Sequence, residues 1–172
     1  VYPEVWRQLW VSSSDSLADV NLALQIAMGW ENSHLHLFIK NGDKYGLIDD
    51  GYSDGTRDEN GWRIRQVLQE PGEQMLYLYD FGDGWEHEVV LEKILPYQFQ
   101  SLIPSCQAGA SACPPEDVGG PLGYEVFLES INDPTVFAHH QRLSWFCDGF
   151  DPQSFDLEQT NERFREGLQT IA

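Results

Sequence analysis

The stretch "YDFGDGWEHEV", residues 79–89, joins two segments that are rich in aromatic and branched residues. The first segment covers residues 74–80 and the second covers residues 86–96, and both have the composition of β-strands. Five residues, "FGDGW", separate them, and the two Gly among these supply the positive φ angles that a tight connection needs. The stretch therefore predicts a β-hairpin.

Alternate side chains of the second predicted strand differ in polarity. His87 shares one face with Val89 and Leu91, whereas Glu86 and Glu88 lie on the other face. We therefore expect His87 to lie on the more apolar face of the hairpin.

The rest of the chain alternates between helical and strand patterns. Apolar residues at helical spacing predict a helix over residues 17–28, with Ser14 or Asp15 as its N-cap and Gly29 at its end. The other predicted strands cover residues 6–11, 34–40 and 43–48, and the other predicted helices cover residues 62–70, 124–131, 137–145 and 157–171. These patterns predict a single α+β domain over residues 1–172, with helices packed on one side of an antiparallel sheet.

Two segments are predicted to be loops. Residues 49–61 are acidic and Gly-bearing, and we expect them to be mobile. Residues 101–124, "SLIPSCQAGASACPPEDVGGPLGY", form a long Cys/Pro/Gly-rich loop that is too dense in Gly and Pro for regular structure. A loop of this length is usually functional or anchored, and both roles stay open for the part from Cys106 to Tyr124.

The charge is strongly negative, with 10 Lys and Arg against 28 Asp and Glu, giving a net charge of −18. Direct binding to nucleic acid or to an anionic membrane is therefore disfavoured, and a protein partner is easier to accommodate. The sequence has no long apolar run and no signal-peptide pattern, and its three Cys leave one unpaired in any disulfide scheme. These features favour a cytoplasmic protein and leave its oligomeric state open.

A metal site is one candidate. His34 and His36 lie two residues apart on one face of a predicted strand, and Cys106 and Cys113 offer two thiols from the long loop. Two His and two Cys are the ligands of a tetrahedral Zn²⁺ site, although six residues between the Cys are more than the usual two to four.

A catalytic site is a second candidate. His87 lies near Asp80 and Asp83, and a His oriented by a carboxylate is half of a catalytic pair, with Cys106 or Cys113 as a nucleophile. The alternative is structural, because Asp80 and Asp83 are also typical residues of a tight turn.

A ligand pocket or partner contact is a third candidate. Trp85 and Glu86 in the hairpin, and Glu116 and Asp117 in the rigid "PPEDVGGP" segment, are the residues that could form it. An internal role for the two acidic residues of the loop is favoured, either as partners of Arg7 or as a helix cap near Tyr124.

Four motifs, in order, carry a family resemblance: "GWENSHLHLF", "YDFGDGWEHEVVLEKIL", "CQAGASACPPEDVGGPLGYEVFL" and "FDPQSFDL" followed by Asn161. The chain resembles the plasmid pRiA4b ORF-3-like family over nearly its whole length. The resemblance implies a bacterial, mostly cytoplasmic domain associated with plasmids or mobile elements. Asn21 departs from the His that many relatives carry in the first helix.

The resemblance gives kinship without chemistry. The resolvase-like labels of some relatives find no support, because "SSSDS", residues 12–16, has no neighbouring Arg to hold a phosphate. The favoured interpretation is therefore a non-enzymatic binding or accessory domain. A small metal-dependent or His/Cys-dependent hydrolase is the alternative, and a nucleic-acid-binding or resolvase-related protein fits less well.

Overall fold

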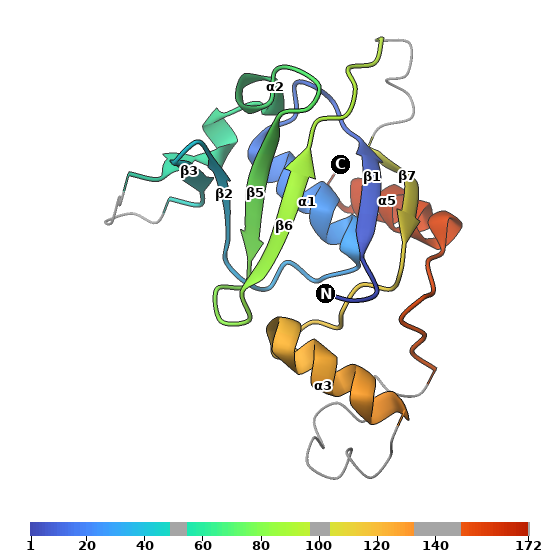
Figure 1. Cartoon of the computed structure of the whole chain (residues 1–172). Coiled ribbons are helices and arrows are strands. Elements are labelled where there is room, and N and C mark those ends of the chain that lie inside the picture. The colour runs from blue at the N-terminus through green and yellow to red at the C-terminus, as the bar shows by residue number, and fades with distance from the viewer. Residues whose placement is uncertain (49–54, 97–103, 133–148, 172) are drawn as a thin grey trace.

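The computed structural model describes residues 1–48, 55–96, 104–132 and 149–171 (Figure 1). Its main sheet has five strands in the order β4-β3-β2-β5-β6. Their bounds are β2 (His36–Lys40), β3 (Asp43–Gly46), β4 (Arg57–Asp58), β5 (Gln74–Tyr79) and β6 (Trp85–Val90). All neighbours in this sheet are antiparallel except β3 and β4, and β1 (Trp6–Trp10) pairs antiparallel with β7 (Ser105–Ala110) in a second sheet.

The predicted hairpin is confirmed as β5 and β6, in which Tyr79 pairs with Trp85 and Tyr77 pairs with His87. Gly84, at a φ of +70°, donates its N–H to the Asp80 carbonyl at 2.6 Å and closes the turn. The second strand ends at Val90 and not near residue 96 as predicted. The strand loses its neighbour there, because the opposite chain turns away at Pro71 and Gly72 before β5 begins.

The predicted first helix is confirmed as α1 (Leu17–Met28), and Gly29 ends it at a φ of +79°. Its N-cap is Ser16, where Ser14 or Asp15 was predicted. The Ser16 hydroxyl accepts from the Asp19 N–H, and the Asp19 carboxylate accepts from the Ser16 N–H at 2.8 Å. This reciprocal capping box satisfies two N–H groups, which a cap at Ser14 would leave unpaired.

The core lies between α1 and one face of the main sheet. Leu17 and Val20 of α1 pack with Phe38 and Tyr77 of the sheet, and all four are buried. On the back of α1, α5 (Leu157–Ile171) packs through Phe164 against a second cluster that includes Cys106 of β7. Helices α1 and α5 thus lie on the same side of the main sheet (Figure 1), and the predicted α+β class is confirmed.

The long segment of residues 101–124 is not without regular structure, contrary to the prediction. It contains β7, and α3 (Gly120–Asn132) begins earlier than the helix predicted from residue 124. β7 has small residues because its neighbours approach closely: a Cβ atom on Gly109 would lie 2.7 Å from the Phe155 ring. Gly and Pro, which suggested a loop, here permit close packing and start a helix. Within the described part of the segment, which begins at Pro104, the residues between β7 and α3 that lack regular structure are 111–119.

The remaining predictions have mixed outcomes. The strand over 43–48 is confirmed as β3, and the helix over 62–70 is confirmed as the shorter α2 (Ile64–Val67). The described part of the acidic loop, residues 55–61, contains β4 and a 3₁₀ turn, η1 (Glu59–Gly61). The helix predicted over 137–145 lies outside the described residues. Within the described ranges, none of the helices has the length and apolarity needed to span a membrane.

Candidate metal centre

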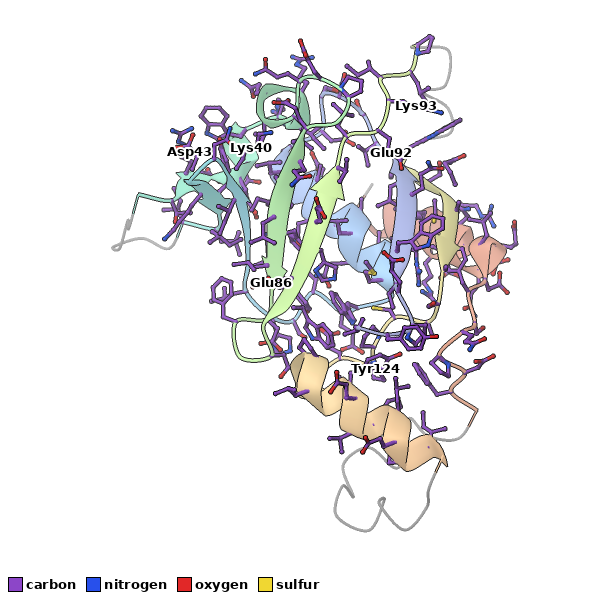
Figure 2. The ribbon with its side chains drawn as sticks, in the orientation of Figure 1. Lys40, Asp43, Glu86, Glu92, Lys93 and Tyr124 are labelled. Atoms are coloured by element: carbon purple, nitrogen blue, oxygen red, sulfur yellow. The ribbon has the colours of Figure 1, made fainter. Side chains whose placement is uncertain are left out.

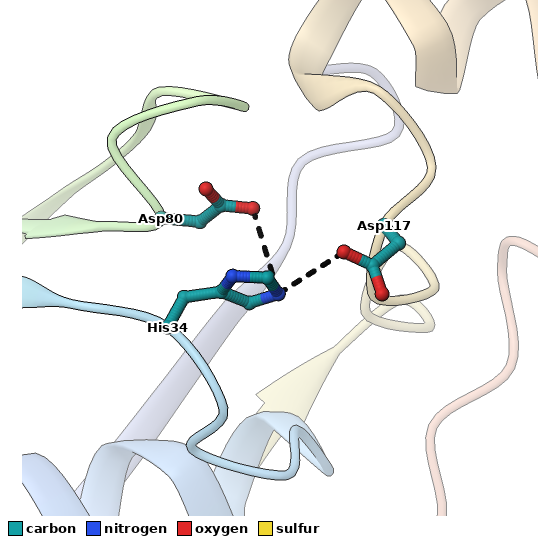
Figure 3. A group of neighbouring side chains, drawn as sticks. All are labelled: His34, Asp80 and Asp117. Carbon is teal, nitrogen blue, oxygen red and sulfur yellow. Dashed lines mark ion pairs between the residues drawn. The ribbon is translucent and has the colours of Figure 1, made fainter.

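Three segments that are distant in sequence meet at one end of the main sheet. His34 lies between α1 and β2, Asp80 directly follows β5, and Asp117 lies in the 111–119 loop (Figure 3). The Nε2 atom of His34 lies 3.0 Å from Asp117 Oδ1 and 3.8 Å from Asp80 Oδ2. One ligand atom from each residue lies within 4.8 Å of the other two. We call these three residues the His34 cluster.

Asp80 is fixed by the turn that it begins. Its Oδ1 atom accepts hydrogen bonds from the N–H groups of Gly82 at 3.0 Å and Asp83 at 3.3 Å. The backbone of Asp80 has a φ of +51°, which is uncommon for a residue other than Gly. Because Oδ1 is occupied by the turn, Oδ2 is left facing His34 (Figure 3).

Asp117 is held in place through its neighbours in the chain. Asp117 has a φ of +58°, and its side chain is 75% exposed. Two residues later, the Gly119 N–H donates to the Asp83 carboxylate at 3.0 Å. Gly120 also packs on the turn, because a Cβ atom there would lie less than 3.0 Å from the Asp83 carbonyl oxygen. We call this contact between Asp83 and Gly119–Gly120 the turn–loop clamp.

Glu116 lies beside the cluster, but its carboxylate already has three donors. These are the hydroxyl of Tyr79, the hydroxyl of Ser33 at 3.1 Å and the N–H of Glu31 at 2.7 Å. Burial, followed by the nearby Glu116 carboxylate, raises the pKa of Tyr79 to about 12, so Tyr79 stays protonated and donates. The predicted internal role of Glu116 therefore has these partners. Arg7 instead donates to the carbonyls of Trp6, Ala27, Ala110 and Ser111.

The free nitrogen of His34 is the unusual feature of the cluster. Its Nε2 atom is buried and has no hydrogen-bond partner, although a carboxylate oxygen lies 3.0 Å away. The short approach to Asp117 is not a hydrogen bond, because distance alone does not make one and the ring N–H must also point at the acceptor. A buried polar nitrogen without a hydrogen-bond partner is uncommon, and a bound metal ion is one group that would satisfy it.

One imidazole nitrogen and two carboxylate oxygens are a mixed donor set. Zn²⁺ and other first-row divalent ions accept such ligands, whereas Ca²⁺ and Mg²⁺ prefer oxygen alone. Zn²⁺ binds these atoms at about 2.0–2.2 Å. A tetrahedral ion with bonds of this length holds its ligand atoms about 3.3–3.6 Å apart. The Asp117 oxygen, 3.0 Å from His34 Nε2, would therefore move slightly away from that nitrogen, and the Asp80 oxygen, at 3.8 Å, would move slightly closer. The exposed Asp117 side chain can make this change by rotation.

The four predicted zinc ligands do not form one group. His36 is buried and its Nε2 atom pairs with Glu59 Oε2 at 2.7 Å. Cys106 lies in the second core cluster, and Cys113 lines a cavity beside His87. The four residues were predicted from the alternation of side chains along the strand and from the chemistry of the loop. In the structure, the part of the loop that lies beside His34 contributes Asp117 and not a Cys. Within the described ranges, the His34 cluster is the one group of this kind.

The predicted catalytic pair of His87 with Asp80 or Asp83 is likewise not assembled. Asp80 faces His34 and Asp83 holds Gly119, whereas the His87 ring packs edge-on against Trp30 at 5.3 Å. Burial lowers the pKa of His87 to about 4. Trp85 and Glu86 line one cavity with His87, whereas the other two residues predicted for a pocket or partner contact, Glu116 and Asp117, are not part of its described lining.

Glu59 is the buried residue that the sequence pattern missed. It lies in the predicted acidic loop, where its carboxylate is indistinguishable from its solvated neighbours. The sequence feature that could have revealed Glu59 lies in β2, the strand of its partner. His36 shares a face with Phe38, and a His on a buried face needs a hydrogen-bond partner. The fully buried Glu59 provides it.

The sequence matches the plasmid pRiA4b ORF-3-like protein family over residues 1–159. The chain belongs to this family. It is 37% identical over 164 residues to the uncharacterized protein y4hQ of Sinorhizobium fredii (strain NBRC 101917 / NGR234), covering 94% of this chain and 84% of that protein. It is also similar to the crystal structure of MM3350, a protein of unknown function from Methanosarcina mazei Go1. The TM-score is 0.79 at 35% identity, over 92% of this chain and 90% of that one.

Proposed function

We propose that this protein is a binding or accessory domain that holds a divalent transition-metal ion at the His34 cluster. The observation that carries the proposal is the convergence of one imidazole nitrogen and two carboxylate oxygens within 4.8 Å. The buried His34 nitrogen without a hydrogen-bond partner supports it, because a metal ion would give this atom a ligand bond.

The surroundings of the cluster support a preorganised site. Asp80 is oriented by two backbone N–H groups, and the loop that carries Asp117 is fixed by the turn–loop clamp and by Glu116. Hydrogen bonds to the groups around a metal ligand orient that ligand and strengthen binding. The uncommon φ angles of Asp80 and Asp117 fit the same interpretation, because strained backbone gathers at functional sites.

Three protein ligands leave at least one coordination position free on a tetrahedral ion. We propose that a donor atom of a partner protein occupies this position. A metal-bridged contact suits an acidic domain, because the bound ion adds positive charge where two carboxylates would otherwise repel an acidic partner.

Isothermal titration of Zn²⁺ into chelator-treated protein tests metal binding, with Mg²⁺ as the oxygen-preferring comparison. We expect one Zn²⁺ per chain and no saturable Mg²⁺ binding. Replacing a ligand in His34→Ala or Asp117→Asn should weaken Zn²⁺ binding by at least the roughly 10–100-fold that losing an outer partner costs. The control Glu125→Gln removes an exposed carboxylate of α3 and should bind as the parent does. Zn²⁺ binding that both ligand variants leave unchanged would disprove the site.

A metal-dependent hydrolase is a second candidate, and the exposure of Asp117 favours it because a substrate can approach the ion from solvent. Turnover of an activated ester or phosphoester by Zn²⁺-loaded protein would support this candidate if Asp117→Asn abolishes it. Absence of turnover in protein that binds Zn²⁺ would leave the binding function and remove the hydrolase.

A further inference from the structure

A cavity of about 340 Å³ lies between the start of β6 and the segment that precedes β1, and its described lining does not include the residues of the His34 cluster. It is lined by residues of the segment around Glu4 and Val5, by the start of β6, and by Cys113, Pro114 and Pro121. Its volume is within the range of small-molecule sites. Trp30 and Trp85 provide most of its aromatic surface, and their ring centroids are 5.9 Å apart.

The interior of the cavity is polar but uncharged. The imidazole of His87, which is half-buried, is part of the lining. Because burial holds the pKa of His87 near 4, the imidazole is neutral at pH 7 and can accept a hydrogen bond. Burial also raises the pKa of Cys113 to about 12, so its thiol stays protonated. A neutral thiol beside a neutral imidazole does not provide the thiolate that nucleophilic catalysis needs.

The charged side chains that line the cavity are negative. Glu4 and Glu86 are both exposed, and they are the charged side chains of the lining (Figure 2 labels Glu86). The described part of the lining includes no Lys or Arg. The net charge of −18 adds a field that attracts cations and repels anions.

We propose that this cavity binds a small organic cation, namely a protonated amine attached to an apolar or aromatic body. The body contacts Trp30 and Trp85, whose ring faces also attract a cation. The ammonium group donates a hydrogen bond to the neutral His87 imidazole, and Glu4 and Glu86 stabilise its charge from the rim. This site is separate from the His34 cluster and does not depend on a metal ion.

Three probes of one shape but different charge test the proposal: phenethylamine, 2-phenylethanol and 3-phenylpropionate. Indole N–H signals in ¹H–¹⁵N NMR spectra report binding, because the chain has only six Trp. The Trp30 signal is a direct reporter, since its Nε1–H donates to the Pro114 carbonyl at the cavity wall. We expect saturable shifts of Trp30 and Trp85 with the amine, roughly tenfold weaker binding of the alcohol, and none of the carboxylate. Equal affinity for amine and alcohol, or no saturable shift with the amine, would overturn the proposal.

Two variants identify the groups involved. His87→Leu removes the acceptor and should reduce amine affinity at least tenfold, and Glu86→Gln should reduce it about threefold. Glu88→Gln is the matched control, because Glu88 is exposed on the same face of β6 and does not line this cavity. If His87→Leu does not fold, the pair at Glu86 and Glu88 decides the matter. Equal amine affinity in Glu86→Gln and Glu88→Gln would then exclude the charge recognition that we propose.

Discussion

The His34 cluster and the His87 cavity are built from the same hairpin and the same loop, yet they differ in almost every property. The cluster combines an imidazole with two carboxylates, one of which is 75% exposed. The cavity combines an imidazole with a thiol and two Trp, and burial keeps both titratable groups neutral. Asp80 and His87 are only seven residues apart, so the surroundings of each side chain decide its chemistry.

On these proposals, one end of the sheet serves two kinds of ligand. A strand directs alternate side chains to opposite faces, so His87 of β6 faces the core. Asp80 has already left the strand, and its positive φ turns it toward the surface loop. The turn–loop clamp then holds the loop beside both sites, so that Asp117 lies at the His34 cluster and Cys113 lines the His87 cavity.

The largest effect is expected from breaking the clamp that the two sites share. Gly120→Ala would place a Cβ atom against the Asp83 carbonyl at a φ of +70°. We expect a loss of about 1–2 kcal/mol from the positive φ and about 1–3 kcal/mol more from overpacking. Urea unfolding measures the loss, and both Zn²⁺ and amine binding should weaken.

Gly42→Ala is the control for the clamp. Gly42 also has a positive φ, of +88°, but no atom lies within 4 Å of a Cβ atom placed there. Gly42→Ala should therefore reduce the free energy of unfolding by only about 1–2 kcal/mol and leave the binding of Zn²⁺ and of the amine unchanged. An equal loss in the two variants would show that the clamp contributes nothing beyond backbone conformation.

The second effect is a dependence of stability on pH that arises from the neutral His87 of the cavity. The pKa of His87 falls from its ordinary value of 6.5 to about 4 on folding. The unfolded chain therefore binds a proton that the folded chain does not, and stability is lost as pH falls from about 6.5 to about 4. The shift corresponds to roughly 3 kcal/mol.

His87→Gln removes this titration, so its free energy of unfolding should fall less than that of the parent between pH 7 and pH 4. Urea unfolding at both pH values measures the two losses. Carboxylates titrate in the parent and the variant alike, so the difference between them isolates His87. Parallel losses would show that His87 is not buried in neutral form.

The smallest effect compares two tyrosine hydroxyls, that of Tyr79 beside the His34 cluster and that of Tyr124 on α3. Tyr79 donates to Glu116 and accepts from the Ser33 N–H, whereas the hydroxyl of Tyr124 is buried without a partner. Tyr79→Phe should cost about 1–3 kcal/mol and weaken Zn²⁺ binding, because Glu116 loses a donor. Tyr124→Phe should be nearly neutral or stabilising. Thermal unfolding of both variants tests this ranking, and a larger loss for Tyr124→Phe would reverse it.

Local patterns were sufficient to predict most of the fold. The hairpin, α1 and α5 have periodicity and turn residues that reflect the structure directly. β7 was missed because its sequence, "SCQAGA", lacks the large residues that indicate a strand. Gly109 of β7 is small because the side chains of Arg7 and Phe155 lie against it. Both residues are distant in sequence, so the local sequence around β7 does not reveal this constraint.

The sequence singled out the residues of the candidate site but did not predict that they lie together. His34, Asp80 and Asp117 were each singled out, but for three different roles. Their convergence depends on the turn–loop clamp, which joins residues 36 positions apart and leaves no spacing pattern in the sequence. Matching His with Cys followed the chemistry of zinc, whereas the fold matches His34 with carboxylates.

The clamp also has a consequence for the order of folding. Its hydrogen bond from Gly119 to Asp83 closes a segment of the chain with a sequence separation of 36 residues. Closing such a segment costs entropy that local contacts do not repay, so contacts of this kind form after the hairpin itself. A partly folded chain would then have its hairpin and helices while Asp117 and Cys113 were still unplaced. On this order, the hairpin forms first and the two proposed sites are completed later.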